Sequence, residues 1–441
     1  MTTNLVDRKT LLGTVEQALW RQPVRDMHTH LYSPVFGSPV PNATGSTDAA
    51  GLLLWGVDEL VTYHYLIAEV YRVVPATKLP YEQFFKMSKS QQADHIWKHL
   101  FVENTPLSEA CRGVLTTLQK LGLDPNETTL DSYRKYFAAY TPDKYIDKVM
   151  ELANVSSITM TNPVFDDNER ARWLKDPTTL GSDSRFKAVL RIDPLLRGYP
   201  AAARLMSSWG YAVNPEIDAK SIEESRRFLR DWIDRQKAIY LAVSLPPDFR
   251  YPAPESDPIA RCGQTMLEKV VLPVCAERGL PFAMMIGSRL RVNPALGDAG
   301  DMVGKSDVAS VTNICRDFPN NKFFVTMLAR ENQHEMCVAA RKFGNLMLFG
   351  CWWFLNNPSL IEEIERMRFE LLGTSFIPQH SDARVLDQLV YKWEHSRRII
   401  GKVLVDKYQD LLDTGRRLTK EQIERDVRLM LEENFTSFLN R

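Results

Sequence analysis

The sequence lacks an excess of charge of either sign, since its 441 residues hold 55 Lys and Arg against 55 Asp and Glu. Without net charge the protein has no general attraction to a polyanion, so neither nucleic acid nor an anionic membrane is an expected partner. No apolar run approaches the roughly 18 residues that a membrane-spanning helix needs. Charged residues at 7–9 precede the first apolar segment, which does not fit a secretory signal. We therefore expect a cytoplasmic protein.

Cysteine is scarce, scattered and never arranged as C-x-x-C, which favours reduced thiols over a disulfide framework or a zinc ribbon. The phosphate-binding motifs G-x-x-x-x-G-K-[ST] and G-x-G-x-x-G are absent, and so is the nucleophile motif G-x-S-x-G. Nucleotide binding and α/β-hydrolase chemistry therefore have no support from motifs.

What the sequence does contain is an alternation of short apolar segments with amphipathic helical patterns. Eight segments are expected to be strands: Val24–His30, Ser156–Thr161, Phe186–Asp193, Ala238–Leu245, Pro281–Gly287, Phe323–Leu328, Asn345–Phe354 and Thr374–Asp382. Helical patterns lie between most of them, at Ser221–Arg235, Thr265–Arg278, Glu331–Phe343 and Ser359–Leu372, and another follows at Leu386–Tyr408. This alternation predicts an α/β protein with a parallel sheet and right-handed crossovers. Eight strands favour a closed (β/α)8 TIM-like barrel over an open, doubly wound sheet.

The connection between the first two expected strands is far longer than a normal βα loop, at about 125 residues. It contains helical patterns at Val57–Val74, Tyr81–Leu100, Leu107–Leu121 and Asp143–Ala153. We therefore predict a helical insertion after strand 1. The expected organisation is a barrel start at 1–30, the insertion at 31–155, and the rest of the barrel with C-terminal helices at 156–441.

His28 and His30 close the first strand and are the sharpest candidate site. Residues i and i+2 of a strand face the same side, so both imidazoles can chelate one divalent cation. Asp382 ends the last expected strand, which neighbours the first in a closed barrel, and it is the best candidate for a third ligand. Imidazole and carboxylate suit zinc, manganese or iron, and composition does not choose among them. Two structural histidines remain the competing interpretation.

Other polar groups are ambiguous on the residues alone. Arg191 follows an apolar strand, and a buried guanidinium needs a partner, either a substrate carboxylate or Asp193. Packing explains His64, Tyr65 and Trp353 as readily as a function does.

Five segments, in order and spread over nearly the whole chain, resemble the uronate isomerase (glucuronate isomerase) family of the amidohydrolase superfamily, in its divergent bacterial branch. They are DMHTHL (Asp26–Leu31), DELVTYHYLIAEV (Asp58–Val70), LRIDP (Leu190–Pro194), FGCWWF (Phe349–Phe354) and HSDAR (His380–Arg384). The resemblance implies a distorted (β/α)8 barrel acting in sugar-acid catabolism. Its reaction would interconvert D-glucuronate with D-fructuronate and D-galacturonate with D-tagaturonate.

The resemblance also implies roles for individual residues. The implied metal ligands are His28, His30 and Asp382, the implied catalytic groups are Asp382, Tyr65, His64 and Arg384, and the implied substrate contacts are Arg191, Trp353 and Arg384. The expected partner is a small sugar acid. The subunit count, a homo-oligomer included, and the preferred uronate epimer stay open.

Two rival functions belong to other classes. A metal-dependent hydrolase of a small amide or lactone could use the same ligands to activate water. Such hydrolases commonly add His or Lys ligands from the middle strands, whereas this chain has Ser244 and Met285 there. The second rival is a sugar-acid-binding protein without catalysis.

Overall fold

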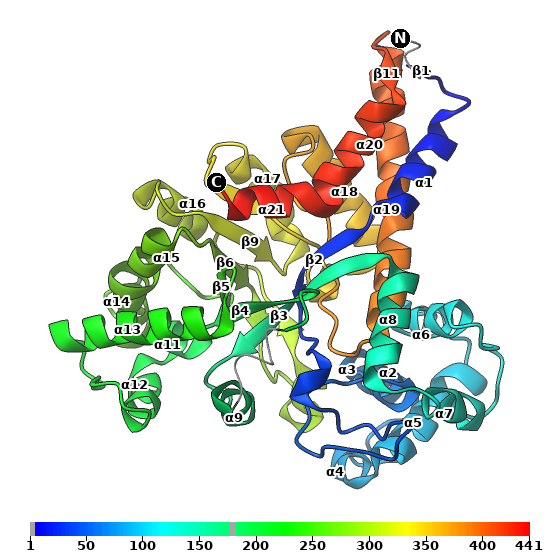
Figure 1. Cartoon of the computed structure of the whole chain (residues 1–441), viewed down its shortest axis with the longest axis horizontal. Helices are drawn as coiled ribbons and strands as arrows, with labels where there is room; N and C mark the ends of the chain where they lie inside the picture. The colour runs from blue at the N-terminus through cyan, green and yellow to red at the C-terminus, as the bar shows by residue number, and fades with distance from the viewer. Residues whose placement is uncertain (1–4, 176–181) are drawn as a thin grey trace.

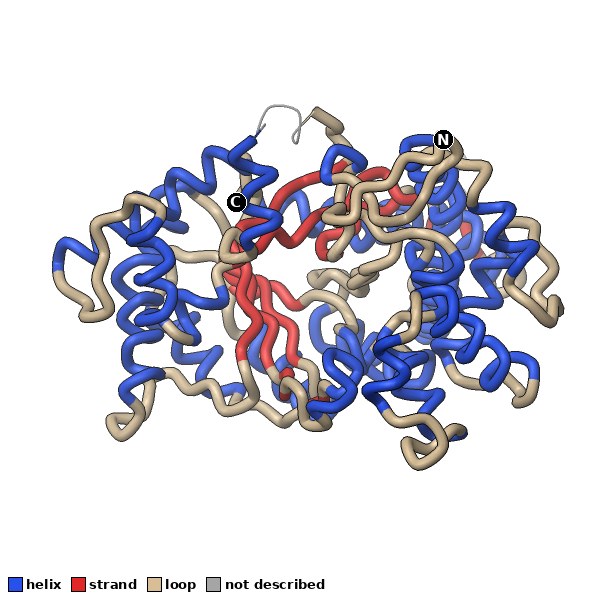
Figure 2. Tube along the Cα trace, turned by 90° about the horizontal axis from the view of Figure 1, so that it is seen from below, coloured by secondary structure: helices blue, strands red, loops and turns tan. Residues whose placement is uncertain are grey.

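The computed structural model describes residues 5–175 and 182–441 (Figure 1). These residues form a seven-stranded parallel sheet in the order β10-β9-β6-β5-β4-β3-β2. Its strands are β2 (Val24–Thr29), β3 (Val155–Pro163), β4 (Phe186–Arg191), β5 (Leu241–Leu245), β6 (Phe282–Ile286), β9 (Phe323–Met327) and β10 (Leu346–Leu348). The sheet is strongly curved and helices lie outside it (Figure 2). The expected α/β, TIM-like barrel fold is confirmed.

Alternate side chains of the strands face opposite layers, as a parallel sheet covered on both faces requires. On β9, Phe323 and Val325 pack in the layer under the outer helices, while Phe324 points into the barrel. There Phe324 meets Phe435 and Phe438, with ring centroids 5.8 and 4.8 Å apart. These two rings come from α21 (Asn434–Leu439), so the end of the chain fills the amino end of the barrel.

The helices after β3 cover the outside of the sheet. They are α9 (Asp167–Lys175), α11 (Asp193–Arg197), α12 (Tyr199–Ser208), α13 (Ala219–Gln236), α14 (Pro258–Met266), α15 (Leu272–Arg278), α16 (Val308–Asp317), α17 (Gln333–Ala340), α18 (Pro358–Leu372) and α19 (Gln388–Asp413). After β6 the chain makes a short excursion through β7 (Ser288–Arg289) and β8 (Met302–Val303). All five helices expected in this region are present, although the expected Thr265–Arg278 helix contains a wider π turn at Leu267–Val271.

Helices also fill the long connection between β2 and β3, at the lower right of Figure 1. They are α2 (Val57–Val61), α3 (His64–Val73), α4 (Tyr81–Lys86), α5 (Lys89–Trp97), α6 (Glu109–Lys120), α7 (Asp131–Phe137) and α8 (Pro142–Ala153). The expected Val57–Val74 helix is in fact two, because Tyr63 is extended with φ −62° and ψ 143°. The expected Tyr81–Leu100 helix is likewise divided into α4 and α5. The division into ranges 1–30, 31–155 and 156–441 stays a prediction, and residues 1–4 and 176–181 of it lie outside the described residues.

The prediction of a regular eighth strand at Thr374–Asp382 is wrong. The segment is extended, but it pairs with β10 only through the Phe349–Ile377 bridge. On its other side, the Asp382 N–H donates to the His28 carbonyl at 3.1 Å. Pro378 cannot donate to a ladder, which is one reason the pairing is interrupted. We call residues 374–385 the closing segment, because it joins β10 to β2 and completes the barrel.

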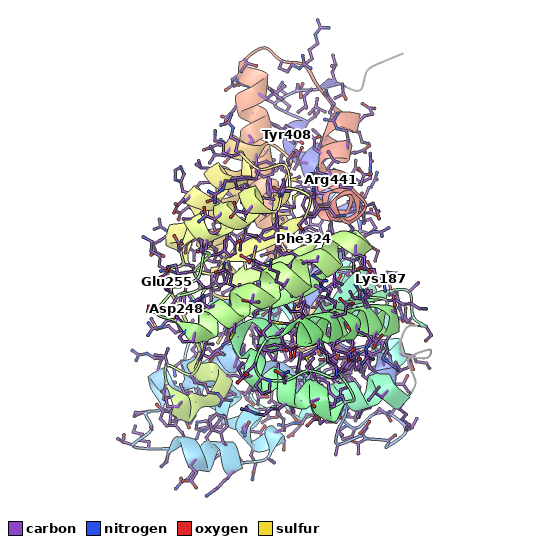
Figure 3. The ribbon with its side chains drawn as sticks, turned by 90° about the vertical axis from the view of Figure 1, so that its left-hand side faces the viewer. Lys187, Asp248, Glu255, Phe324, Tyr408 and Arg441 are labelled. Atoms are coloured by element: carbon purple, nitrogen blue, oxygen red, sulfur yellow. The ribbon has the colours of Figure 1, made fainter. Side chains whose placement is uncertain are left out.

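The beginning of the described chain lies away from the C-terminus, which follows α21 (Figure 1). β1 (Leu5–Val6) pairs antiparallel with β11 (Leu418–Thr419), next to α1 (Leu11–Arg21), α19 and α20 (Lys420–Arg428). In Figure 3, Lys187 early in β4 lies on the opposite side from Asp248 and Glu255, which follow β5. The carboxyl ends of the strands therefore face the side of Asp248 and Glu255. None of the described helices has the length and apolar character needed to cross a bilayer.

Candidate active site

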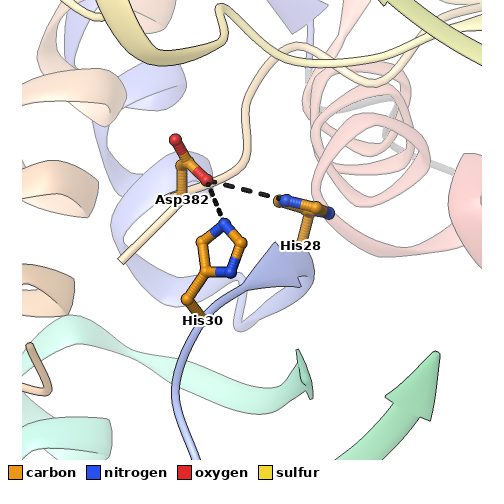
Figure 4. A group of neighbouring side chains, drawn as sticks. All are labelled: His28, His30 and Asp382. Carbon is orange, nitrogen blue, oxygen red and sulfur yellow. Dashed lines mark ion pairs between the residues drawn. The ribbon is translucent and has the colours of Figure 1, made fainter. Parts of the chain in front are cut away.

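His28, His30 and Asp382 converge at the carboxyl end of β2 (Figure 4). Asp382 Oδ1 lies 3.6 Å from His28 Nε2 and 3.3 Å from His30 Nε2. The imidazole centroids are 5.3 Å apart, with the rings nearly perpendicular. In the described part of the chain, these three residues are the one His, Cys, Asp or Glu group whose ligand atoms lie close enough to share a metal ion.

The free polar atoms of the cluster fit a divalent cation. Within the described residues, both ring nitrogens of His28 and the Oδ1 atom of Asp382 are buried without a well-formed hydrogen bond. His30 Nδ1 lies 2.9 Å from Thr161 Oγ1, which leaves its Nε2 directed at the cluster. A ligand histidine held through its other nitrogen is typical of metal sites. Two imidazoles and a carboxylate form a donor set for a divalent metal.

The protonation states of the three side chains also suit metal binding. Burial lowers the pKa of His28 well below its usual value and lowers that of His30, so both rings are neutral near pH 7. Burial works to raise the pKa of Asp382, but the two imidazoles outweigh it and the pKa falls far below its usual range. Neutral imidazole and ionised carboxylate are the forms that bind metals.

A third imidazole, His380, lies behind the cluster. Its ring centroid is 5.3 Å from that of His28, and neither of its nitrogens has a partner among the described residues. Burial lowers the pKa of His380 to about 4. The ring fits because residue 350 is glycine, where a Cβ would lie 1.8 Å from His380 Nδ1.

A cavity opens beside the cluster and contains most of the sequence-predicted residues. Its lining includes His28, His30, His64, Arg191, Trp353, Asp382 and Arg384. Burial, together with Arg384, lowers the pKa of His64 to about 3, so this imidazole is also neutral. Ser244 and Met285 line the same cavity without adding a metal ligand to the cluster.

Arg191 pairs with Asp193, one of the two partners expected for its guanidinium. Its Nε and one terminal nitrogen donate to the two Asp193 carboxylate oxygens at 2.8 and 3.0 Å, and that nitrogen also donates to Ser244 Oγ at 3.1 Å. The guanidinium is therefore held in a fixed plane at the cavity wall. A substrate contact through its remaining edge stays a prediction.

Tyr65 lies next to the cavity rather than in its lining. It borders a neighbouring cavity with Trp353, Tyr391 and Lys392. Its ring centroid is 4.6 Å from that of His64, and its buried hydroxyl has no hydrogen-bond partner among the residues described. Burial raises the pKa of Tyr65 well above its usual value, so it keeps its proton.

Sequence reasoning missed Arg197, which lines the cavity at the end of α11. Its side chain is 34% exposed and reaches Asp193 only at 4.0 Å. It gives the cavity wall a third guanidinium, besides those of Arg191 and Arg384. The only signal in the sequence is its position six residues after Arg191.

No protein-family model and no curated protein matches the sequence. Among solved structures, a uronate isomerase from Bacillus halodurans is 53% identical, covers 99% of this chain and 98% of its own, and superposes with a TM-score of 0.91. The chain belongs to the uronate isomerase family.

Two more distant structures share the fold. A uronate isomerase from Thermotoga maritima and a glucuronate isomerase from Caulobacter crescentus are each 14% identical with a TM-score of 0.74. They cover 99% and 98% of this chain, and 98% and 94% of their own chains. The family resemblance drawn from the five sequence segments is confirmed by the 53% identity to the Bacillus halodurans protein.

Proposed function

We propose that this protein is an aldose–ketose isomerase of uronates, interconverting D-glucuronate with D-fructuronate and D-galacturonate with D-tagaturonate. The supporting observation is the 53% identity to a uronate isomerase over 99% of the chain. The cluster of His28, His30 and Asp382 at a cavity lined by arginines agrees with an anionic sugar as substrate. Its partner is thus a small sugar acid.

His28, His30 and Asp382 are the residues that would hold the divalent metal, with zinc first and manganese or iron as alternatives. A bound cation would supply Lewis acidity and would orient the substrate hydroxyls. The rest of the reaction is assigned to side chains of the chain itself.

The isomerisation moves a proton from C2 to C1 through an enediolate, which requires a base beside the carbon acid. Asp382 is our candidate for that base, because its low pKa keeps it ionised at the cavity. It takes the C2 proton and returns it to C1. The reaction also moves a proton from the C2 hydroxyl to the C1 oxygen.

Tyr65, assisted by His64, is assigned to this oxygen proton transfer. Both are uncharged at pH 7, so Tyr65 has a proton to give and His64 has a free site to accept one. Arg384 would stabilise the enediolate charge, and Trp353 would form the wall against the open-chain substrate. Arg191, already held flat by Asp193, would bind the distant carboxylate.

The test is direct. Purified protein is incubated with D-glucuronate and, separately, D-galacturonate, with and without a chelator, and keto acid formation is followed by NMR. We expect ketose from at least one uronate. Binding of both uronates without ketose would contradict the proposal and favour a binding protein. In a separate incubation with a sugar lactone, release of the acid without any ketose from the uronates would favour the hydrolase.

The remaining expectations rest on the sequence. The balanced charge supports neither nucleic acid nor membrane as a partner, and a cytoplasmic location stays a prediction. A homo-oligomer is likewise left as a prediction.

A further inference from the structure

The closing segment carries Asp382, yet much of its backbone is held by side chains rather than by a strand ladder. Side chains from other elements bind its peptide groups at several points. Asn434 donates to the Thr374 and Phe376 carbonyls, Arg368 donates to that of Pro378, and Gln388 accepts from the N–H groups of Arg384 and Val385. A backbone held in this way takes its position from a few specific contacts.

Two further side chains bind the backbone of Ser381, the residue before Asp382. The Ser381 N–H donates to both carboxylate oxygens of Asp26 at 3.1 and 3.3 Å. The Ser381 carbonyl accepts from Lys392 Nζ. Two opposite charges therefore hold the same residue from its two ends. We call these two side chains the Asp26–Lys392 pair.

The peptide between Ser381 and Asp382 is consequently fixed on both sides. Lys392 binds its carbonyl, and its N–H, which belongs to Asp382, donates to the His28 carbonyl at 3.1 Å. Asp26 lies two residues before His28 on β2. Its bond to Ser381 therefore holds the backbone before Asp382 against the strand that carries His28. On α19, Trp393 next to Lys392 donates to Asp26 Oδ2 at 2.9 Å and holds that carboxylate in place.

Asp382 needs such support because its backbone is strained, with φ +50°. A non-glycine residue in the left-handed region is strained and persists only where the surroundings fix it. The pair is itself costly, since Asp26 is 1% exposed and Lys392 3% exposed. Neutral side chains could bind the same peptide groups with a smaller desolvation cost.

We propose that Asp26 and Lys392 are positioning residues that fix the Ser381–Asp382 peptide so that the Asp382 carboxylate meets His28 and His30. This inference rests on the proposed function, in which Asp382 is both metal ligand and base. Neither residue is in the lining of the cavity that contains the cluster. Their contribution is to hold Asp382 in a strained conformation at the correct distance.

The experiment measures zinc affinity separately from catalysis. The full chain is stripped of metal and titrated with Zn²⁺ against a chromogenic chelator, in wild type and in the variants Lys392→Met, Lys392→Gln and Asp26→Asn. We expect Zn²⁺ affinity to fall about 10–100-fold, the usual effect of losing an outer partner of a ligand. Lys392→Gln keeps a donor for the Ser381 carbonyl, so its loss should be smaller than that of Lys392→Met.

Lys322→Met is the matched control. Lys322 Nζ also donates to backbone carbonyls, of Leu439 at 2.7 Å and of Arg441 at 3.2 Å, but at the amino end of the barrel. Its loss should lower the melting temperature and leave Zn²⁺ affinity unchanged. In the Asp26→Asn/Lys392→Met double variant, the affinity loss should be smaller than the product of the single losses, because both act on one peptide.

Steady-state kinetics with excess zinc give a second readout. We expect kcat to fall about tenfold or more in Lys392→Met while KM changes less, because a misplaced base affects the transition state more than binding. Unchanged zinc affinity and kcat in variants that only melt earlier would overturn the proposal. Failure of all three variants to fold would also overturn it, since the pair would then serve the fold. An inactive wild type with intact zinc binding would instead refute the proposed function.

Discussion

Asp382 and His28 lie at opposite ends of the chain, yet they are joined twice. The Asp382 N–H donates to the His28 carbonyl at 3.1 Å, and the Asp382 carboxylate lies 3.6 Å from His28 Nε2. The backbone contact that closes the barrel is thus made by the same residues whose side chains form the cluster.

Asp382→Asn should abolish proton exchange at C2. An amide cannot act as the base, so exchange of the uronate C2 hydrogen in deuterated water should slow by at least about a hundredfold. NMR of the substrate follows the exchange, and the metal content of the variant is measured beside it. Exchange near the wild-type rate in a metal-loaded variant would assign the base to another residue.

Arg191→Lys should weaken substrate binding. Lysine cannot make the paired contacts of Arg191 with Asp193 and Ser244, so KM for the uronate should rise by about tenfold or more, with a smaller change in kcat. Arg185→Lys is the matched control, because Arg185 also bonds both oxygens of a carboxylate, Asp183, before β4 begins. An equal KM in both variants would remove Arg191 from substrate binding.

Gly350→Ala should destabilise the protein more than a comparable glycine substitution elsewhere. Gly350 has φ +65°, and a Cβ there would meet His380 Nδ1 at 1.8 Å. The conformational cost is about 1–2 kcal/mol, and overpacking adds about 1–3 kcal/mol. Gly279→Ala shares the positive φ but meets nothing within 4 Å, so it should show the conformational cost alone. Urea unfolding compares the two, and equal losses would mean that His380 moves freely.

The free energy of unfolding should fall as the pH rises from 4.5 to about 8, because Glu169 titrates at a higher pH in the folded protein than in the unfolded chain. Burial raises the pKa of Glu169 to about 8, above the 4.5 of an unperturbed glutamate. Between these values the folded protein binds a proton that the unfolded chain has released, so raising the pH favours unfolding, by at most about 1.4 kcal/mol per pH unit. Below pH 4.5 the contribution is fully present, and above pH 8 it is lost.

Glu169→Gln should remove this pH dependence. Glutamine reproduces the protonated side chain, since its oxygen can accept from Asn162 and Trp173 while its amide donates to the Tyr32 oxygen. Urea unfolding at pH 5, 7 and 8.5 should show a flatter stability profile in the variant than in wild type. Parallel profiles would place the titration on another group.

Much of the fold and site could be predicted because their signals are local. The alternation of apolar segments with helices predicts a parallel barrel, since each element shows its own period. The spacing of His28 and His30 places both rings on one face of a strand without any knowledge of the rest of the chain. The pairing of Asp382 with them needed one further assumption, that the last segment neighbours the first.

The long range of other contacts explains what was missed. Thr374–Asp382 has the apolar character of a strand, but several of its backbone groups bond to side chains from β2, α18, α19 and α21 instead of to a neighbouring strand. Asp26 and Lys392 drew no functional assignment, because a single carboxylate on a strand and a single lysine on a helix carry no signal until the fold brings them to the same peptide.

The sequence by itself therefore determined the TIM-like barrel architecture, the family and the shared face of His28 and His30. Periodicity and short motifs are properties of neighbouring residues, so they can be recognised without the fold. Only the tertiary structure decided that the eighth segment is irregular and that Asp193 takes up one side of Arg191. It also decided that two buried charges hold the backbone beside Asp382, because these contacts join residues far apart in the chain whose meeting depends on the closed barrel.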